Sequence, residues 1–301
     1  MTPDRTIEEC LNELSNIAGA DGINLSSEIS ALRRKFSETI DEEKAWSLVR
    51  RARASGRPRA SAVIADAFED FIEMHGDRTY ADDGAIIGGV GLLGGKPVTV
   101  IASQKGSNLR DTVSRNGGMA SPEGYRKALR LAQQAEKFGR PVITLVDTQG
   151  AFPGLGPEER GIGQAIAMNL REFSHLRTPI VCVVLGEGGS GGALGLSVCD
   201  RLLMLENSYF SVITPEAFAS LVLRDPSKKK KAAAMMKVMP EALVKSGFCD
   251  GIIPESSYGE DLSTEEIIRG IRESLLKEIA ALSRRDIDEL LERRDARYFS
   301  F

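Results

Sequence analysis

Arg140-Pro-Val-Ile-Thr-Leu-Val-Asp-Thr-Gln-Gly150 combines a proline, an apolar run rich in β-branched residues and a glycine turn. Two further segments repeat this pattern, Lys96-Pro-Val-Thr-Val-Ile-Ala-Ser-Gln-Lys-Gly106 and Thr178-Pro-Ile-Val-Cys-Val-Val-Leu-Gly-Glu-Gly188. Proline is tolerated at the first residue of a strand, and a continuous apolar run is typical of a strand buried on both faces. The sequence therefore predicts three buried strands, each ending in a glycine turn.

Helical patterns separate these strands, at residues 125–138 and 158–176, and shorter apolar pieces follow at 201–205 and 209–213. Repeated strand–turn–helix units predict an α/β core whose loops gather at one end.

Both ends of the chain have helical patterns. Residues 1–54 predict two or three amphipathic helices with a break near residues 19–22, and residues 264–296 predict one long charged helix. We divide the chain into a helical N-terminal arm with its linker (1–56), an α/β core (57–255) and a C-terminal helical tail (256–301).

Two basic segments leave alternatives open. Residues 50–59 are rich in arginine, glycine and proline, which is typical of a solvated connector but also of a strip that binds phosphate or a partner. Residues 228–231 are four consecutive lysines, interpreted as a solvated helix face or as a clamp for an anionic group.

The composition excludes several classes of protein. Among 301 residues, 39 are basic and 43 acidic, so a protein that wraps nucleic acid is not expected. The 2 histidines and 4 widely separated cysteines argue against a zinc site, an iron–sulfur site or a disulfide framework made by this chain alone. Neither a targeting segment nor a membrane span is predicted, so we expect the cytoplasm.

The densest motif is Gly186-Glu-Gly-Gly-Ser-Gly-Gly-Ala193, directly after the third strand. It satisfies G-x-G-x-x-G, the dinucleotide fingerprint, but the following segment is short for a crossover helix and the unit is third in its series. It also satisfies G-x-S-x-G, the nucleophile elbow of serine hydrolases, but both histidines precede Ser190 where that fold needs one after the serine. Neither interpretation is favoured.

The glycines themselves suggest another role. A glycine-rich turn that leads into a helix presents free backbone N–H groups, which can stabilise an oxyanion. Asp147-Thr-Gln-Gly-Ala-Phe-Pro-Gly154 ends the preceding strand in the same manner. Two such turns could donate to one carbonyl oxygen, although they could also be tight turns without a ligand.

These motifs resemble the carboxyltransferase alpha subunit of bacterial acetyl-CoA carboxylase. The resemblance rests on the two glycine segments and, in the same order, on several shorter motifs: Gly76-Asp-Arg-Thr-Tyr-Ala-Asp-Asp83, Gln104-Lys-Gly106, Pro122-Glu-Gly-Tyr-Arg-Lys-Ala-Leu-Arg130, Glu158-Glu-Arg-Gly161 and Tyr209-Phe-Ser-Val-Ile-Thr-Pro-Glu216. It implies a crotonase-like fold of repeated ββα units.

The resemblance also implies an activity, namely transfer of a carboxyl group from carboxybiotin on a carrier protein to acetyl-CoA, which gives malonyl-CoA for fatty acid biosynthesis. The implied partners are the carboxyltransferase beta subunit, the biotin carboxyl carrier protein and biotin carboxylase, in a hetero-tetramer of paired alpha and beta subunits. Zinc is expected only on the beta partner, and neither membrane nor nucleic acid is expected to bind.

By the same resemblance, N–H groups near Gly150, Ala151, Gly191 and Gly192 act in catalysis by holding the biotin carbonyl. Residues Gly188, Gly189, Phe152 and Gly154 are expected to bind biotin as well.

The chain departs from the family pattern at Gln149, where proline is usual, and at Ser107, where arginine is usual. Two alternative functions stay open: a self-sufficient crotonase-like acyl-CoA hydratase or decarboxylase, and a catalytically silent assembly subunit, which the departure at Gln149 favours.

Overall fold

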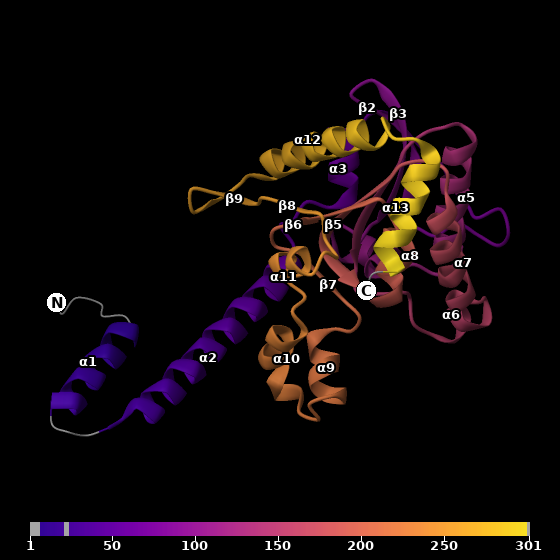
Figure 1. Ribbon diagram of the computed structural model, residues 1–301. Helices are drawn as coiled ribbons and strands as arrows, with labels where there is room; N and C mark the ends of the chain where they lie inside the picture. Colours follow the sequence, from indigo (N-terminus) through magenta and orange to yellow (C-terminus); the bar gives the residue numbers. More distant parts are fainter. Residues whose placement is uncertain (1–6, 21–23, 300–301) are drawn as a thin grey trace.

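One mixed β-sheet forms the centre of the molecule in the computed structural model, which describes residues 7–20 and 24–299 (Figure 1). Its strand order is β1-β2-β3-β4-β5-β6-β8, and β7 pairs with the end of β5. The first three strands are antiparallel, whereas β3 to β6 and β8 run parallel. The strands of this sheet are β1 (Glu69–Glu73), β2 (Ile86–Leu93), β3 (Lys96–Ser103), β4 (Val142–Thr148), β5 (Ile180–Gly189), β6 (Arg201–Leu205), β7 (Tyr209–Ser211) and β8 (Gly251–Ile253).

The three predicted strands are β3, β4 and β5. Pro141 and Pro179 directly precede β4 and β5, and Pro97 is the second residue of β3. Every residue of β4 and β5 is buried, as a continuous apolar run requires. Neither β1 nor β2 was among the predicted strands, since β1 is a charged edge strand without an apolar run and glycines interrupt the apolar pattern of β2.

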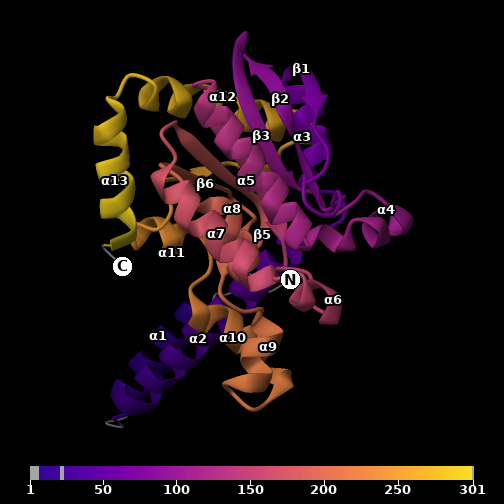
Figure 2. The same ribbon diagram turned by 90° about the vertical axis from the view of Figure 1, so that its right-hand side faces the viewer.

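Helices cover both faces of the sheet (Figure 2). Side chains of α3 and α12 pack on one face, and those of α5, α7 and α8 pack on the other. The helices before β6 are α1 (Ile7–Ala20), α2 (Ser26–Ala52), α3 (Ala60–Ala67), α4 (Leu109–Ser114), α5 (Pro122–Lys137), α6 (Leu155–Glu159), α7 (Ile162–His175) and α8 (Ser190–Ser197). Those that follow are α9 (Pro215–Leu221), α10 (Lys229–Met236), α11 (Pro240–Lys245), α12 (Thr264–Leu282) and α13 (Ile287–Phe299), and a ribbon of β9 (Ser256–Ser257) and β10 (Glu260–Asp261) precedes α12.

The single helix predicted at 264–296 is wrong, because the chain turns between α12 and α13. The Asp286 carboxylate accepts the Asp288 N–H at 2.9 Å and so begins the second helix. The turn lets α13 pack against α7, where Arg294 is fully buried and forms an ion pair with Asp200 at 2.7 Å. Periodicity alone did not reveal this turn, since both helices are amphipathic.

The pattern at 158–176 is likewise divided. Gly161 has a φ of 79°, a conformation that glycine adopts without strain, and it separates α6 from α7.

The N-terminal arm consists of α1 and the long α2, which projects away from the sheet in Figure 1. Part of the predicted break at 19–22 lies outside the described residues. The end of α2 packs with β7 and α10. Lys229 lies over the Trp46 ring at 4.9 Å, and Lys230 forms an ion pair with Glu43, so two of the four consecutive lysines contact α2. The division at residues 56 and 255 stays a prediction.

Candidate active site

The two glycine turns are in direct contact. Since β4 and β5 are parallel neighbours with Thr148 opposite Gly188, the turns that follow them meet at one edge of the sheet. A Cβ atom on Gly189 would lie 2.0 Å from the Gln149 carbonyl oxygen, and one on Gly192 would lie 2.3 Å from the Ala151 nitrogen. Only glycine permits this approach of two backbones.

Three of the N–H groups that this edge contributes belong to the start of α8. The first N–H groups of a helix have no acceptor within it, and no side chain caps α8. Gly191 is half-buried, and a Cβ atom there would have its nearest neighbour, a methyl carbon of Ile166, at 3.9 Å. Space therefore exists beside Gly191, whereas the turn at Gly150 and Ala151 fills the corresponding position at Gly192.

The turn after β4 contributes one donor. The Gly150 N–H donates to the Thr148 hydroxyl at 3.2 Å, and the Phe152 N–H donates to the Ala120 carbonyl at 2.9 Å. Between them, no described residue accepts the N–H of Ala151, which is half-buried. Of the two predicted donors Gly150 and Ala151, only Ala151 therefore has an N–H group without an acceptor among the described residues, and the catalytic role of both stays a prediction.

The other four predicted site residues, Gly188, Gly189, Phe152 and Gly154, differ in what surrounds them. A Cβ atom on Gly188 would lie 2.5 Å from a Phe210 ring carbon, so Gly188 and Gly189 have packing reasons to be glycine that do not depend on a ligand. Phe152 is half-buried beside Ala151, and Gly154 precedes α6 with a φ of 139°. Their binding role stays a prediction.

A buried cluster of charges, which no motif in the sequence indicated, lies at the strand ends just before the two turns. Lys105, Asp147 and Glu187 come from the ends of β3, β4 and β5. The Lys105 ammonium lies 2.7 Å from Asp147 Oδ1 and 2.6 Å from Glu187 Oε1. The Glu187 N–H donates to the same Asp147 oxygen at 2.9 Å. These contacts link the three strand ends immediately before the glycine turns.

Arginines of the segment 50–59 complete this cluster. Arg53 forms ion pairs with Glu187 at 2.7 Å and with Glu216 at 2.6 Å, and Arg59 pairs with Asp147 at 2.9 Å. The Arg57 side chain is 7% exposed, pairs with Glu255 at 2.8 Å and donates to the Leu185 carbonyl. The interpretation of this segment as a solvated connector is therefore wrong for these three arginines, because buried carboxylates bind them. In the sequence these contacts are indicated only by the number of arginines at 50–59 and by the acidic residues Asp147 and Glu187 near the ends of the predicted strands.

The cluster keeps Glu187 ionised. Burial by itself would raise the pKa of Glu187, but the Lys105 ammonium, the Tyr209 hydroxyl at 2.5 Å and Arg53 outweigh it and lower this pKa to about 2. Burial and the Glu187 charge raise the pKa of Tyr209, so this hydroxyl stays protonated and donates. Opposite charges in contact thus keep the Glu187 carboxylate ionised at this edge of the sheet.

The surroundings of Ser190 support neither the dinucleotide fingerprint nor the nucleophile elbow. Ser190 is exposed at the junction of β5 and α8, with a φ of 53°. His75 bonds Asp82 at 2.9 Å, and His175 lies near the Arg171 carbonyl at 2.8 Å, both on exposed surfaces. Within the described part of the chain, no group of three or more His, Cys, Asp and Glu residues is placed to hold a metal ion. No helix of residues 7–20 or 24–299 is both long and apolar enough to span a bilayer.

Solved structures of similar fold define the class. The transcarboxylase 12S core with methylmalonyl-coenzyme A bound matches 75% of this chain and 42% of its own, with a TM-score of 0.60 and 21% identity. A Pseudomonas malonate decarboxylase hetero-tetramer with coenzyme A matches 71% of this chain and 85% of its own, with a TM-score of 0.57 and 21% identity. The protein has the crotonase-like fold of the carboxyltransferases.

Sequence comparison gives the family. A family model described as acetyl co-enzyme A carboxylase carboxyltransferase-like matches residues 2–301, and the chain belongs to this family. The acetyl-coenzyme A carboxylase carboxyl transferase subunit alpha of Treponema denticola is 54% identical over 276 residues, which are 92% of this chain and 90% of the relative. The subunit of the same name from Streptococcus thermophilus is 50% identical over 251 residues, 83% of this chain and 96% of the relative.

Proposed function

We propose that this chain is the alpha subunit of the acetyl-CoA carboxylase carboxyltransferase. It takes part in moving the carboxyl group from carboxybiotin, carried on the biotin carboxyl carrier protein, to acetyl-CoA. The product is malonyl-CoA, the first committed intermediate of fatty acid biosynthesis. The observation that carries the proposal is the close approach of Gly192 to the Ala151 turn, because backbone N–H groups that follow two neighbouring strands can then donate to one oxygen atom.

In this proposal the chain contributes hydrogen-bond donors and no side-chain base. Carboxybiotin, as substrate, supplies the carboxyl group and a nitrogen that can accept a proton. The N–H groups of Ala151, Gly191 and Gly192 stabilise the negative charge on the biotin carbonyl oxygen, and such a donor is worth roughly 10²–10³ in rate. Gly189 allows the two turns to meet, Gly188 leaves room for the Phe210 ring, and Gly150 belongs to the turn that carries Ala151. Phe152 and Gly154 line the approach in this proposal. Buried Lys105 and Glu187 keep the strand ends in register.

An apolar surface next to these turns is evidence that the chain binds another protein there. A cavity of about 460 Å³ is lined by Phe210, Phe218, Phe248 and neighbouring apolar residues. Close by in sequence, Val212, Leu221 and Met235 are 85%, 72% and 51% exposed. A large exposed apolar patch marks an interaction site. We assign it to the beta subunit, which would hold the acetyl-CoA thioester and carry the zinc site.

The remaining partners belong to the same proposal. These partners are the biotin carboxyl carrier protein and biotin carboxylase. The alpha and beta subunits are proposed to form a hetero-tetramer of two alpha and two beta subunits, located in the cytoplasm.

The test is an assay of malonyl-CoA formation from acetyl-CoA and carboxylated carrier protein. It compares this chain alone, a beta subunit alone and their mixture. We expect malonyl-CoA from the mixture only. A comparable rate with the chain alone would favour the self-sufficient enzyme, and a mixture whose rate is insensitive to substitutions at Gly191 would favour the silent assembly subunit.

A further inference from the structure

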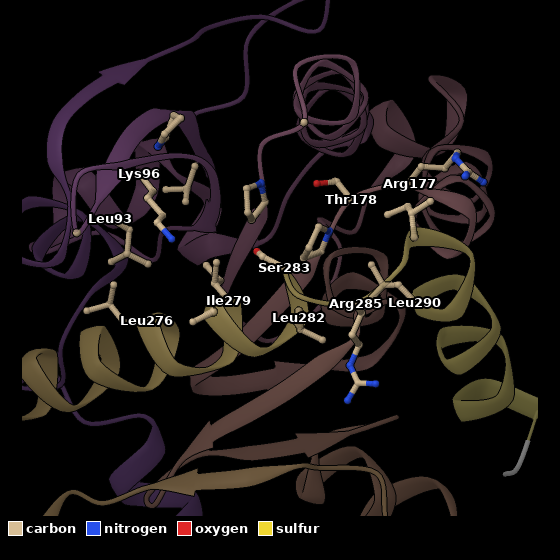
Figure 3. Close-up of a pocket in the computed structure, with 18 residues that line it drawn as sticks. Leu93, Lys96, Arg177, Thr178, Leu276, Ile279, Leu282, Ser283, Arg285 and Leu290 are labelled. Carbon is tan, nitrogen blue, oxygen red and sulfur yellow. The ribbon is translucent and has the colours of Figure 1, made fainter.

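A second cavity lies at the opposite end of the sheet from the glycine turns. It has a volume of about 520 Å³ and is bounded by the starts of β3, β4 and β5 and by the corner between α12 and α13 (Figure 3). Ligand pockets in proteins span about 300–1,000 Å³, so this cavity has the size of a small-molecule site. The carboxyl-transfer reaction proposed above does not use it.

The walls of the cavity are apolar. Leu93, Leu276, Ile279, Leu282 and Leu290 line it. So do Pro97, Pro141 and Pro179, the prolines of the repeated strand pattern. Because proline has no N–H, these three positions present rings and no donors to the cavity. The repeated prolines thus give three neighbouring strands a common apolar end.

The rim of the cavity is basic. Arg177 is paired with Asp288 at 2.8 Å and Arg285 with Glu289 at 2.6 Å, so α13 compensates both charges. Lys96 is exposed, and no carboxylate of the described residues lies within ion-pair distance of its ammonium group. Lys96 lies on the same side of the cavity as Leu93 and Leu276 (Figure 3). One uncompensated positive charge therefore borders an apolar volume.

We propose that this cavity binds an amphipathic carboxylate, with its alkyl chain against the prolines and α12 and its carboxylate at Lys96. An apolar interior favours an alkyl chain by about 0.8 kcal/mol for each buried methylene, and the cation selects the sign of the head group. The 7 residues of β4 separate this site from the glycine turns. At about 3.3 Å a residue they place the two sites roughly 23 Å apart. The proposal is therefore independent of the carboxyl-transfer function.

The test is calorimetric titration of the full chain with decanoate, octanoate and decyltrimethylammonium. Decanoate should bind saturably with a stoichiometry of one. Octanoate lacks two methylenes and should bind roughly tenfold more weakly. Decyltrimethylammonium has the same chain with a cationic head and should show no saturable binding.

Matched variants locate the site. Ala280 and Ala281 are adjacent exposed residues of α12, but only Ala280 lines the cavity. Ala280→Trp should fill the cavity and abolish decanoate binding, whereas Ala281→Trp should leave it unchanged. Lys96→Glu should weaken decanoate binding at least tenfold. Lys277→Glu, at an exposed lysine of α12 that does not line the cavity, should not weaken it.

Three results would overturn the proposal: no saturable decanoate binding, equal binding by Ala280→Trp and Ala281→Trp, or equal affinity for decanoate and decyltrimethylammonium. The last would indicate apolar adsorption without selection of charge. Malonyl-CoA formation is not a readout here, so failure of the proposed function and failure of this proposal are distinguishable.

Discussion

The Lys105 ammonium lies 2.6 Å from a Glu187 carboxylate oxygen, although 82 residues separate the two in sequence. The same ammonium contacts Asp147, and the backbone N–H of Glu187 donates to that aspartate. The ends of three strands are thereby joined by two carboxylates and one cation, directly before the turns that carry the proposed donors. This arrangement makes the buried charges a determinant of turn geometry, and several consequences can be measured.

Glu187→Gln should destabilise the protein by about 3 kcal/mol, because removing one member of a buried ion pair leaves its partners under-compensated. Lys105 would keep only Asp147, and Arg53 would keep only Glu216. Urea unfolding at pH 7 measures the change. Glu273→Gln, at an exposed position of α12, serves as the control and should change the unfolding free energy by less than about 0.5 kcal/mol. Equal stability of the two variants would contradict the role of Glu187.

The pKa of Glu187, lowered to about 2, predicts a pH dependence of this difference. A carboxylate whose pKa is depressed by folding stabilises the protein above its unfolded pKa, and that contribution is lost as the pH falls towards the folded pKa. The unfolding free energies of the wild type and Glu187→Gln should therefore differ most above pH 5. The difference between these two unfolding free energies should shrink by about 3 kcal/mol as the pH falls from 5 to 2. A difference that is constant over this range would show that Glu187 has an ordinary pKa.

Gly191 and Gly192 should respond differently to substitution. A Cβ atom on Gly192 would collide with the Ala151 nitrogen, so Gly192→Ala should displace the turn and lower both stability and activity. Gly191 has room in the folded chain, so Gly191→Val should fold normally and still assemble with the beta subunit. It should lose at least about 100-fold in malonyl-CoA formation, because the side chain blocks access to the N–H groups.

The control for both glycine variants is Gly270→Ala. A Cβ atom there would make an ordinary contact of 3.5 Å with Ile253, and alanine is the better helix former. Full activity of Gly191→Val would contradict the assignment of these N–H groups as donors to the biotin carbonyl oxygen.

Ser190→Ala should retain most of the carboxyltransferase activity, because the proposed mechanism uses backbone N–H groups and no nucleophilic serine. Its φ of 53° is unfavourable for any residue with a Cβ atom, so Ser190→Gly should raise the unfolding free energy by about 1 kcal/mol. Thermal unfolding compares both variants with the wild type. A loss beyond about 10³-fold in Ser190→Ala, with the fold intact, would instead support a nucleophilic serine.

Local patterns in the sequence were sufficient for the central strands and for the two glycine turns. A buried strand needs a continuous apolar run, and a close backbone approach needs glycine. Both features can therefore be recognised from the residue types at those positions alone. The same reasoning failed at the turn between α12 and α13, because an amphipathic pattern continues on both sides of Asp286.

Only the tertiary structure decided which backbone donors are available and which charges are buried. The N–H of Phe152 is taken up by Ala120, and that of Gly150 by Thr148, so Ala151 is distinguished from its neighbours by its contacts and not by its residue type. Arg53 reaches Glu187 across 134 residues of sequence. In the sequence an arginine of a polar connector and an arginine bound to a buried carboxylate are alike, because the free energy of the ion pair depends on distance and burial, which exist only once the chain has folded.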